Sequence, residues 1–227
     1  MLSETHKENR VKCAREFLQQ CAENTEEFLD SIVTGDKTLC HYVTPETKQQ
    51  SKQWRHSDSP RPKKFKQTLS AGKVMATVFW DRKGVLLVDF MPTGTTINSE
   101  KYCKTLKKLR RAIQNRRRGR LTKGVRLHHD NARPHVSRNT KALIEQFGWE
   151  IVEQAAYSPD LAPSDFHLFP KLKQHLGGQR FATDEEVQNA VTTYLNGLAA
   201  EVLEAGFQKW ISRQQKCVEK FGDYVEK

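Results

Sequence analysis

The sequence predicts an α/β domain in which a mixed five-stranded sheet is flanked by helices. Residues 30–91 contain three extended segments, residues 99–157 alternate helical and extended patterns, and the remainder is helical. Strands joined by a tight turn pair antiparallel, whereas strands separated by a helix usually run parallel in one sheet. At 227 residues the chain can bury a core of its own. We therefore expect residues 1–227 to form a single domain.

The N-terminal region predicts a helix and then the first strand. Apolar residues recur along one face of residues 3–22, and Thr5 and Glu8 have the spacing of a capping box. After a turn at Asn24, the segment DSIVTGDKTLCHYV (30–43) is rich in β-branched residues and alternates in part. That pattern predicts a strand.

A long polar segment separates the first strand from a predicted β-hairpin. Residues 44–72 contain three prolines and no apolar period, and connections of this length are usually functional or disordered. KVMATVFW (73–80) and VLLVDFM (85–91), joined by the turn DRKG (81–84), predict two antiparallel strands. The long segment is thus a basic insertion between the first two strands.

Helices and short strands alternate in the next part of the chain. Ser99 is a candidate N-cap for a helix whose apolar stripe has spacings of 4, 3 and 4. VRLHHD (125–130) and WEIVEQAAY (149–157) predict strands, and residues 137–148 between them predict a helix with a Ser cap and a Gly stop. The apolar stripe of the first helix consists of Tyr102, Leu106, Leu109 and Ile113.

The last third of the chain predicts three helices. The first starts at Asp165 and ends at the Gly177–Gly178 break, with Leu168, Leu172 and Leu176 on one face. A second helix follows a Thr183 cap, and a third lies around residues 200–220.

This order of elements is that of a ribonuclease H-like domain. In that fold the first and fourth strands are neighbours at the centre of the sheet, so Asp36 and Asp130 would face each other. Asp165, at the start of the following helix, would complete a cluster of three acids. The 34 residues between Asp130 and Asp165 have the pattern of one helix and one strand.

A cluster of three carboxylates predicts a metal site. Clustered carboxylates repel one another unless cations neutralise them, and oxygen-only ligands suit Mg²⁺ or Mn²⁺. Two such ions about 3.5–4 Å apart can activate a water or a 3′-hydroxyl and stabilise the leaving oxygen. We therefore predict that Asp36, Asp130 and Asp165 are the catalytic residues and the ligands of two ions, with Asp36 bridging them.

Other residues compete for these roles. Asp160 competes with Asp165, Asp89 competes weakly with Asp36, and a single Asp beside Gly or Pro is usually part of a turn or a cap. A zinc site is a further alternative, although the separations of the candidate ligands match no usual zinc pattern. Those candidates are His128, His129, His135 and His167.

The charge of the chain points to a polyanionic partner. The net charge is +11 and the isoelectric point is near 9.5. Residues 101–126 contain twelve Lys or Arg and no acid, and residues 44–68 contain seven against Glu46 and Asp58. Trp54 and Phe65 in the second stretch could stack on a base, pack on a partner subunit or anchor a solvated loop. The predicted DNA contacts are Lys63, Lys64, Lys66, Arg116, Arg117, Arg118, Arg120, Arg133 and His135.

Composition also bears on the cellular location. The five cysteines are scattered, none forms a C-x-x-C pair, and we expect reduced thiols in an intracellular protein. No run of 18 apolar residues exists, so we expect no transmembrane helix. RPKKFK (61–66) and RRRGR (116–120) could act as nuclear localisation signals, and we expect the protein in the nucleus.

Five segments resemble, in the same order, the signature segments of a mariner-type transposase. The similarity extends from about residue 3 to WISRQQKCVEKFGDY (210–224). The catalytic triad of that family is three aspartates, the last two separated by 34 residues. The resemblance therefore implies Asp36 as the first acid and Asp165, rather than Asp160, as the third. The five segments are VTGDKTLCHYV, PETKQQSKQW, GKVMATVFWD, HHDNARPH and YSPDLAPSDFHLF.

The resemblance implies an enzyme of DNA transposition. Members are endonucleases and strand transferases that cut both strands at transposon ends and join the freed 3′-hydroxyls to TA target sites. They work as homodimers with divalent metal, and their long insertion reaches the partner subunit. The chain resembles their catalytic domain without the N-terminal helix-turn-helix region. It departs from the family at Lys37 and Leu39, where an acidic residue and a tryptophan are usual.

Three functions remain open on the sequence. The leading one is a DNA-cleaving and strand-joining enzyme, which retention of all three acids favours. The alternative is a domesticated or decayed DNA-binding protein without strand-transfer activity, which the departures at Lys37 and Leu39 favour. A more distant third is a ribonuclease H-like nuclease that acts on another nucleic acid.

Overall fold

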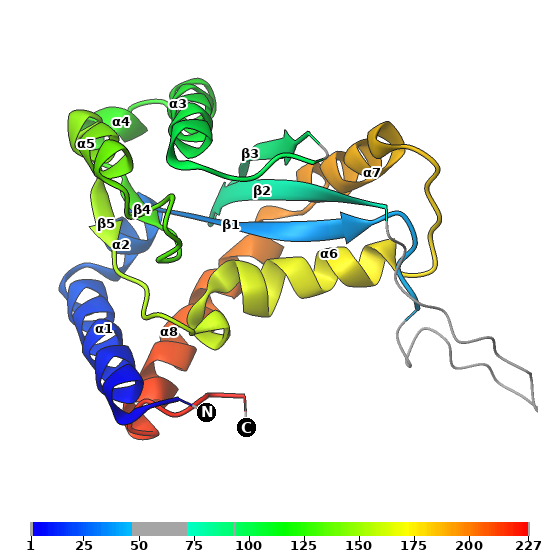
Figure 1. The fold of residues 1–227 in the computed structure, drawn as a ribbon. Helices are drawn as coiled ribbons and strands as arrows, with labels where there is room; N and C mark the ends of the chain where they lie inside the picture. Colours follow the sequence, from blue (N-terminus) through cyan, green and yellow to red (C-terminus); the bar gives the residue numbers. More distant parts are fainter. Residues whose placement is uncertain (1, 47–71, 93, 227) are drawn as a thin grey trace, which may run out of the picture.

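The computed structural model describes residues 2–46, 72–92 and 94–226. Within them a five-stranded sheet has the order β3-β2-β1-β4-β5 (Figure 1). β1, β2 and β3 pair antiparallel, whereas β1, β4 and β5 pair parallel. The predicted mixed sheet, with the first and fourth strands adjacent, is therefore confirmed. The strands are β1 (Ile32–His41), β2 (Lys73–Asp81), β3 (Gly84–Met91), β4 (Arg126–His128) and β5 (Glu150–Val152).

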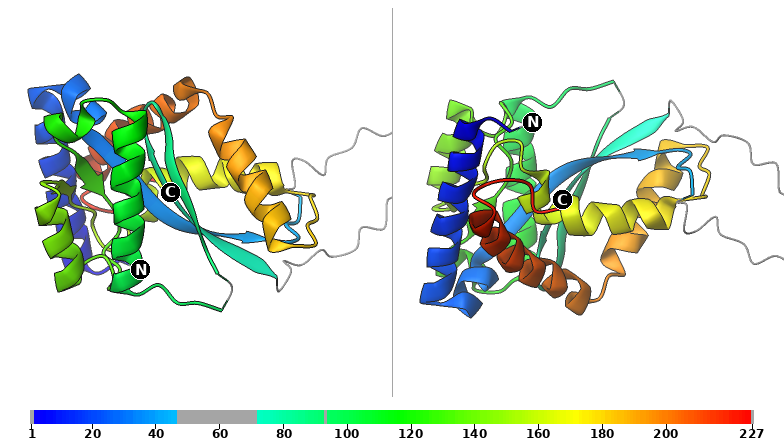
Figure 2. Two further views of the ribbon diagram at one scale, coloured as in Figure 1. Left: turned by 90° about the horizontal axis from the view of Figure 1, so that it is seen from above. Right: turned by 90° about the horizontal axis from the view of Figure 1, so that it is seen from below.

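Helices cover both faces of this sheet. Figure 2 shows α3 and α5 on one side, and α6 and α8 crossing the other. The N-terminal helix α1 packs beside α8 at one end of the sheet (Figure 1). The helical elements are α1 (Glu4–Glu23), α2 (Thr25–Ser31), α3 (Ser99–Arg116), α4 (Arg120–Lys123), α5 (Arg138–Gln146), η1 (Pro159–Leu161), η2 (Ser164–Leu168), α6 (Phe169–Leu176), α7 (Asp184–Asn196) and α8 (Ala200–Glu219).

Two hydrophobic cores lie on the two faces of the sheet. Successive residues of β1 contribute to different cores because side chains alternate along a strand: Ile32 packs in one and Val33 in the other. The first core joins Trp80 of β2 to the aromatic residues of α8, including Phe207 and Trp210. The predicted stripe of α3 forms the second core, where Tyr102, Leu106, Leu109 and Ile113 are all buried.

Some predicted helix ends are wrong by one or two residues. Helix α1 is capped by Ser3, whose hydroxyl accepts from the His6 N–H, and not by Thr5. Helix α3 is capped by Asn98 because its side-chain oxygen accepts from Lys101 N at 2.9 Å, so Ser99 is already helical. Ser and Asn are both strong N-caps, and backbone geometry decides between neighbours.

Other differences concern short elements. Residues 25–31 form α2, and Asn24 caps it, whereas the sequence predicts a turn at Asn24 and a strand from residue 30. The strands predicted over 125–130 and 149–157 are only three residues long, at Arg126–His128 and Glu150–Val152. Both strands end where the chain leaves its parallel neighbour, which frees the residues beyond them to build loops. The Ser137 and Thr183 caps are confirmed, and Gly148 ends α5 with a φ of 67°.

Most of the predicted basic insertion lies outside the described residues. The insertion was predicted over 44–72, and residues 47–71 are not described. Lys63, Lys64, Lys66, Trp54 and Phe65 fall in that part, so the predictions for them remain predictions.

Candidate active site

Two of the three predicted acids are placed by the parallel pairing of β1 with β4. Thr34 of β1 pairs with His128 of β4. Asp36 and Asp130 each follow two residues later along their own chain segments, so they extend from the same end of this strand pair. Ligand sites of α/β sheets commonly lie outside the carboxyl ends of parallel strands. The sequence prediction that these two acids would be neighbours is consistent with this register.

Asp165 is brought to the same site by a single π-helical turn, η2. This turn precedes α6 and packs against β1. The side chains of Asp36 and Asp165 lie close enough to affect each other's pKa, although they are separated by much of the chain. A π-turn inside a helical segment is rare and is frequent at functional sites. The predicted helix beginning at Asp165 therefore starts with an irregular turn that carries the acid.

The electrostatics of Asp36 reflect a crowded group of carboxylates. Burial and then the neighbouring charge of Asp165 raise the pKa of Asp36 to about 7, and Asp130 adds to the effect. Burial also raises the pKa of Asp165. When two carboxyls share a site, one of them holds its proton far above the usual range. Asp36 and Asp165 therefore behave as a pair that binds a proton in the absence of a cation.

The pKa of Asp130 is lowered, in contrast to those of Asp36 and Asp165. Burial works against its ionisation, but the hydrogen bond and charge of His135, the charge of Lys37 and the Ala132 N–H outweigh burial and hold the pKa of Asp130 at about 2. His135 Nδ1 lies 2.5 Å from an Asp130 carboxylate oxygen. Asp130 is thus ionised at neutral pH beside a pair of acids that is partly protonated.

A stack of rings supports the Asp130 loop. Tyr102 of α3 stacks on His135 with ring centroids 3.9 Å apart, and His129 stacks on His135 at 5.0 Å while its ring lies 5.8 Å from that of Tyr102. Tyr102 Oη and His129 Nδ1 are hydrogen-bonded at 2.7 Å. Burial, the largest effect, lowers the pKa of His129 to about 3, so this ring is neutral at pH 7. The sequence identified Tyr102 only as a member of an apolar stripe, because a stripe does not reveal which member carries a polar contact.

A second set of contacts fixes the turn that carries Asp165. Trp80 Nε1 donates to Ser164 Oγ at 3.0 Å, and His167 Nε2 donates to the Val202 carbonyl at 2.6 Å. Gly206 of α8 lies beneath this turn, where an added Cβ would be 2.7 Å from the His167 ring. The residues before and after Asp165 are therefore anchored to β2 and α8. No local sequence signal could have identified Trp80 as a partner, because it lies 84 residues away from Ser164.

The three acids suit a hard divalent cation in ligand type and charge. All donors are carboxylate oxygens, and their mutual repulsion is a cost that a cation would remove. Within residues 2–46, 72–92 and 94–226, no three His, Cys, Asp or Glu side chains already converge as one metal site. Instead Asp36 interacts with Asp165, and Asp130 contacts His135. This finding also gives no support to zinc at the histidines, since His128 contacts Thr34 and Trp210 instead.

The competing acids have other partners. Arg10 donates two hydrogen bonds to the Asp160 carboxylate at 2.8 and 2.7 Å, and both side chains are buried. Asp89 accepts from Thr105 Oγ1 and Lys108 Nζ, both at 2.6 Å. These contacts give Asp160 and Asp89 structural roles away from the acid cluster.

The predicted DNA contacts in the described part of the chain differ in their surroundings. The Arg117 guanidinium donates two hydrogen bonds to the Asp81 carboxylate, at 2.8 and 2.9 Å. Arg116 donates to the Val85 carbonyl. Arg118 and Arg133 are exposed, whereas His135 is buried against Asp130. Two nitrogens of Arg120 are buried without a hydrogen-bond partner among the described residues. For all of these residues, binding to DNA remains a prediction.

Comparison with known proteins identifies the family. The family model described as "Transposase (partial DDE domain)" matches residues 44–123. The chain is 31% identical to the solved catalytic domain of the Mos1 mariner transposase, covers 99% of its own length and 98% of that chain, and superposes with a TM-score of 0.83. The chain belongs to the mariner-type transposases. It corresponds to their catalytic domain, and the ribonuclease H-like fold is confirmed.

Two curated proteins are also similar to this mariner-type catalytic domain. It is 35% identical to the Mariner Mos1 transposase of Drosophila mauritiana over 202 residues, which is 88% of the chain and 57% of that protein. It is 33% identical to the human histone-lysine N-methyltransferase SETMAR over 227 residues, which is 99% of the chain and 32% of that protein. The chain thus spans about a third to somewhat over half of the length of these relatives.

Solved complexes of Mos1 have the same fold. A Mos1 strand transfer complex and a Mos1 paired-end complex with Mn match at 33% identity, with TM-scores of 0.86 and 0.88. The chain covers 99% of its own length and 64% of the protein chain in each.

Two further predictions concern the cysteines and membrane-spanning helices. All five cysteines are free. No helix in the described parts of the chain is long and apolar enough to cross a membrane.

Proposed function

We propose that this chain is the catalytic part of a DNA transposase. It would hydrolyse phosphodiester bonds at transposon ends and transfer the 3′-hydroxyl ends into target DNA at TA sites. The observation that supports the proposal is that the charges of Asp130 and Asp165 both act on Asp36 at one end of the β1–β4 pair, in a chain that matches the Mos1 catalytic domain over 98% of its length. The strand transfer complex solved for Mos1 supports the second step.

Asp36, Asp130 and Asp165 would hold two Mg²⁺ or Mn²⁺ ions, with Asp36 shared, which when bound supply charge neutralisation and an activated nucleophile. Mos1 structures with Mn and with Mg support this choice of ions. The protein's own part is to present ionised oxygens. Asp130 is already ionised, whereas the raised pKa of Asp36 means that its proton must leave before all three acids act together.

Residues around the acids would set their geometry. His135 holds one oxygen of Asp130, and the Tyr102 and His129 rings hold His135 in place. The bond from Trp80 to Ser164 fixes the turn that carries Asp165. In-line displacement requires groups held to within a fraction of an ångström, so these supports matter for rate and not only for folding.

The partners and location are further parts of the proposal. The paired-end complexes of Mos1 support a homodimer that brings two transposon ends together. A basic chain with a net charge of +11 favours DNA as the substrate. The basic tracts at 61–66 and 116–120 favour the nucleus, where the DNA substrate lies.

One observation favours the lesser candidate, a DNA-binding protein that has lost strand transfer. The positive charge of Lys37 lies close enough to lower the pKa of Asp36 and of Asp130. A fixed cation beside the acids would also repel incoming metal ions. Such a protein would have lost metal-dependent strand transfer but would still bind DNA.

Nicking of supercoiled plasmid in Mg²⁺ or Mn²⁺ tests the proposal. We expect metal-dependent nicking by the parent and none by Asp130→Ala or Asp165→Ala, while both variants still bind DNA. Glu185→Ala is the matched control because it removes one exposed carboxylate on α7, outside the acid cluster. Equal nicking by the parent and both variants would refute the site. A parent that binds DNA but never nicks it would favour the lesser candidate.

A further inference from the structure

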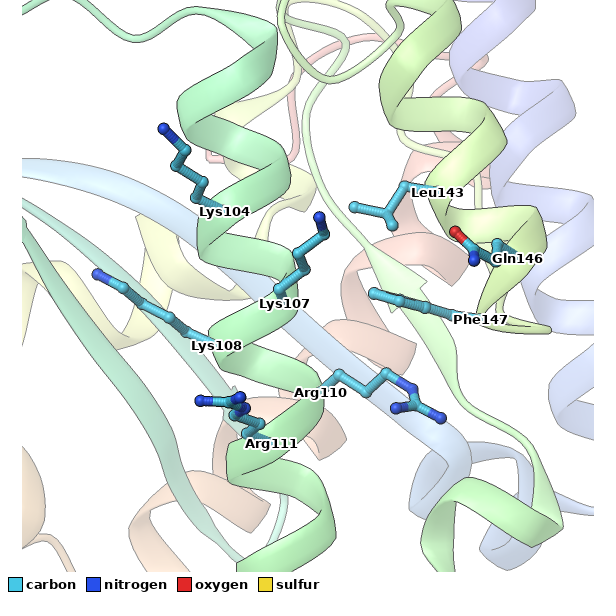
Figure 3. A pocket seen from close by; sticks show the side chains of 8 residues that line it. All are labelled: Lys104, Lys107, Lys108, Arg110, Arg111, Leu143, Gln146 and Phe147. Atoms are coloured by element: carbon cyan, nitrogen blue, oxygen red, sulfur yellow. The ribbon is translucent and has the colours of Figure 1, made fainter.

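We propose that the groove between α3 and α5 binds the sugar-phosphate backbone of duplex DNA as it leaves the acid cluster. This inference rests on the proposed function, and it assigns DNA binding to side chains other than the predicted Arg116, Arg117, Arg118 and Arg120. The groove has a volume of about 550 Å³. Figure 3 shows its lining: Lys104, Lys107, Lys108, Arg110 and Arg111 from α3, and Leu143, Gln146 and Phe147 from the α5 side.

All charged residues that line this groove are positive. Five of its eight lining residues are Lys or Arg and none is acidic. All five cationic side chains belong to exposed residues of α3. Cations concentrated along one helix face raise the local concentration of a polyanion and fix its path.

Two of these cations are available for a ligand. Lys107 and Arg111 have neither an ion pair nor a hydrogen bond among the residues that the structure describes, and they are one helical turn apart on α3. Lys104 pairs with Glu100 and Lys108 with Asp89, both near the surface. Exposed ion pairs are weak, so a phosphate could draw either lysine away at little cost.

The groove also has an apolar floor. Leu143 is buried, and Arg110 lies over the Phe147 ring with its guanidinium carbon 5.3 Å from the centroid. Aliphatic and aromatic carbon can pack against deoxyribose while the surrounding cations bind phosphates. The floor is the feature that distinguishes this groove from the arginine-rich end of α3, where Arg116 and Arg117 are bonded to the hairpin.

The length of the groove fits a short stretch of backbone. Lys104 and Arg111 are seven residues apart, which is about 10 Å along a helix. One strand of B-DNA carries a phosphate about every 3.4 Å of axis, so this face can bind roughly three phosphates. We favour duplex DNA over an acidic peptide because the same chain carries the proposed DNA-cleaving site, to which α3 contributes Tyr102.

The groove is connected to the acid cluster through α3 itself. Tyr102, in the first turn of α3, stacks on His135, which bonds Asp130. Lys104 follows two residues later, and the other cations continue along the same helix. The contact to the acids and the cations of the groove thus belong to the same helix, with Tyr102 on its buried face and the cations on its exposed face. Contacts of this kind bind backbone and not bases, so they would be independent of sequence.

Titration of a fluorescent duplex of random sequence over a range of salt concentrations tests this inference. The variant is Lys107→Ala/Arg111→Ala, and the matched control is Lys209→Ala/Lys216→Ala, which removes two exposed charges from α8 on the other face of the sheet. For the groove variant we expect roughly tenfold weaker binding at low salt and a salt slope reduced by about 2. The control should keep the parent affinity to within about twofold.

A second readout separates this inference from the proposed function. Asp130→Ala should lose plasmid nicking but keep the DNA affinity of the parent, whereas the groove variant should lose DNA affinity and therefore nick less at limiting protein. If the parent never nicks but the groove variant still loses affinity selectively, the groove stands and the proposed function fails. Equal DNA affinity in the parent, groove variant and control would overturn the groove. So would a poly-glutamate peptide that binds with the same dependence on Lys107 and Arg111 while duplex binding does not depend on them.

Discussion

Arg10 of α1 and Asp160 of η1 form a bidentate ion pair in which both side chains are almost completely buried. Arg10 also donates to the Gly222 carbonyl at 2.8 Å, and the Val225 N–H donates to Asp160 at 3.0 Å. The pair therefore joins the first helix, the segment before Asp165 and the C-terminal tail. Figure 1 shows the two termini side by side at this end of the molecule.

Removing one partner of this pair should destabilise the protein strongly. Arg10→Met leaves Asp160 as a buried charge with no cation, which typically costs about 3–5 kcal/mol. For a chain of this size we expect a fall in Tm of roughly 6–20 °C, measured by differential scanning calorimetry. Lys12→Met on the same helix is the control, because Lys12 is exposed and forms only a long contact with Glu16. A Tm loss in Arg10→Met no larger than in the control would contradict the structural role of the pair.

The hydrogen bond between Trp80 and Ser164 should couple stability to the Asp165 turn. Ser164→Ala leaves the buried Trp80 N–H without its acceptor, which costs about 1–3 kcal/mol. A double-mutant cycle with Trp80→Phe should give a coupling energy on the order of 1 kcal/mol, because the second change has no hydrogen bond left to remove. Denaturant unfolding measures it, and additive effects would show that the bond contributes nothing. Nicking should fall in Ser164→Ala more than in a surface variant of equal stability.

Gly206→Ala should destabilise the protein although Gly206 lies within α8. In an exposed helix this change is stabilising by about 1 kcal/mol. Here the new Cβ would lie 2.7 Å from the His167 ring and 3.1 Å from the Trp80 ring, and such overpacking typically costs about 1–3 kcal/mol. A net loss of stability in urea unfolding is expected, with reduced nicking because His167 is two residues from Asp165. Unchanged or increased stability would show that the His167 and Trp80 rings can move away from the new methyl group at little cost. Gln208→Ala, an exposed α8 change, is the control.

Asp36→Asn should stabilise the metal-free protein at alkaline pH. The pKa of Asp36 is about 7 in the folded chain against an ordinary value of 3.8, so the folded state holds a proton that the unfolded state releases. Stability due to this group is present below pH 4 and is lost as pH rises to 7. In chelator at pH 8 we expect the variant to gain about 1 kcal/mol or more, roughly 2–4 °C in Tm, and little at pH 4.

The same pair of proteins tests metal binding without any activity assay. Mg²⁺ at pH 8 should raise the Tm of the parent, because binding to the folded state alone stabilises it. The rise should be much smaller in Asp36→Asn, which has one carboxylate fewer. A variant that is less stable than the parent in chelator at pH 8 would contradict the repulsion between these acids.

The sequence by itself determined the order of the strands and of most helices, and it proposed the three acids, whose catalytic role remains a prediction. Apolar stripes such as that of α3 and the hairpin of β2 and β3 are local patterns, and the structure confirms both. The strands around Asp130 proved shorter than predicted, because three parallel pairs suffice before the chain must turn. The helix α2 was not predicted, since only seven residues form it and its last two, Asp30 and Ser31, belong to the segment predicted as a strand.

Only the tertiary structure decided which groups touch. Asp160 and Asp165 lie five residues apart and look alike in sequence, but one meets Arg10 from 150 residues away and the other meets Asp36. The supports of the site, Tyr102, Trp80 and Gly206, carry no local signal because their partners come from other elements. Local patterns are fixed by neighbours within a turn or a strand. Burial, charge pairing and a shifted pKa depend on residues that folding brings together, and the chemistry of this site depends on those.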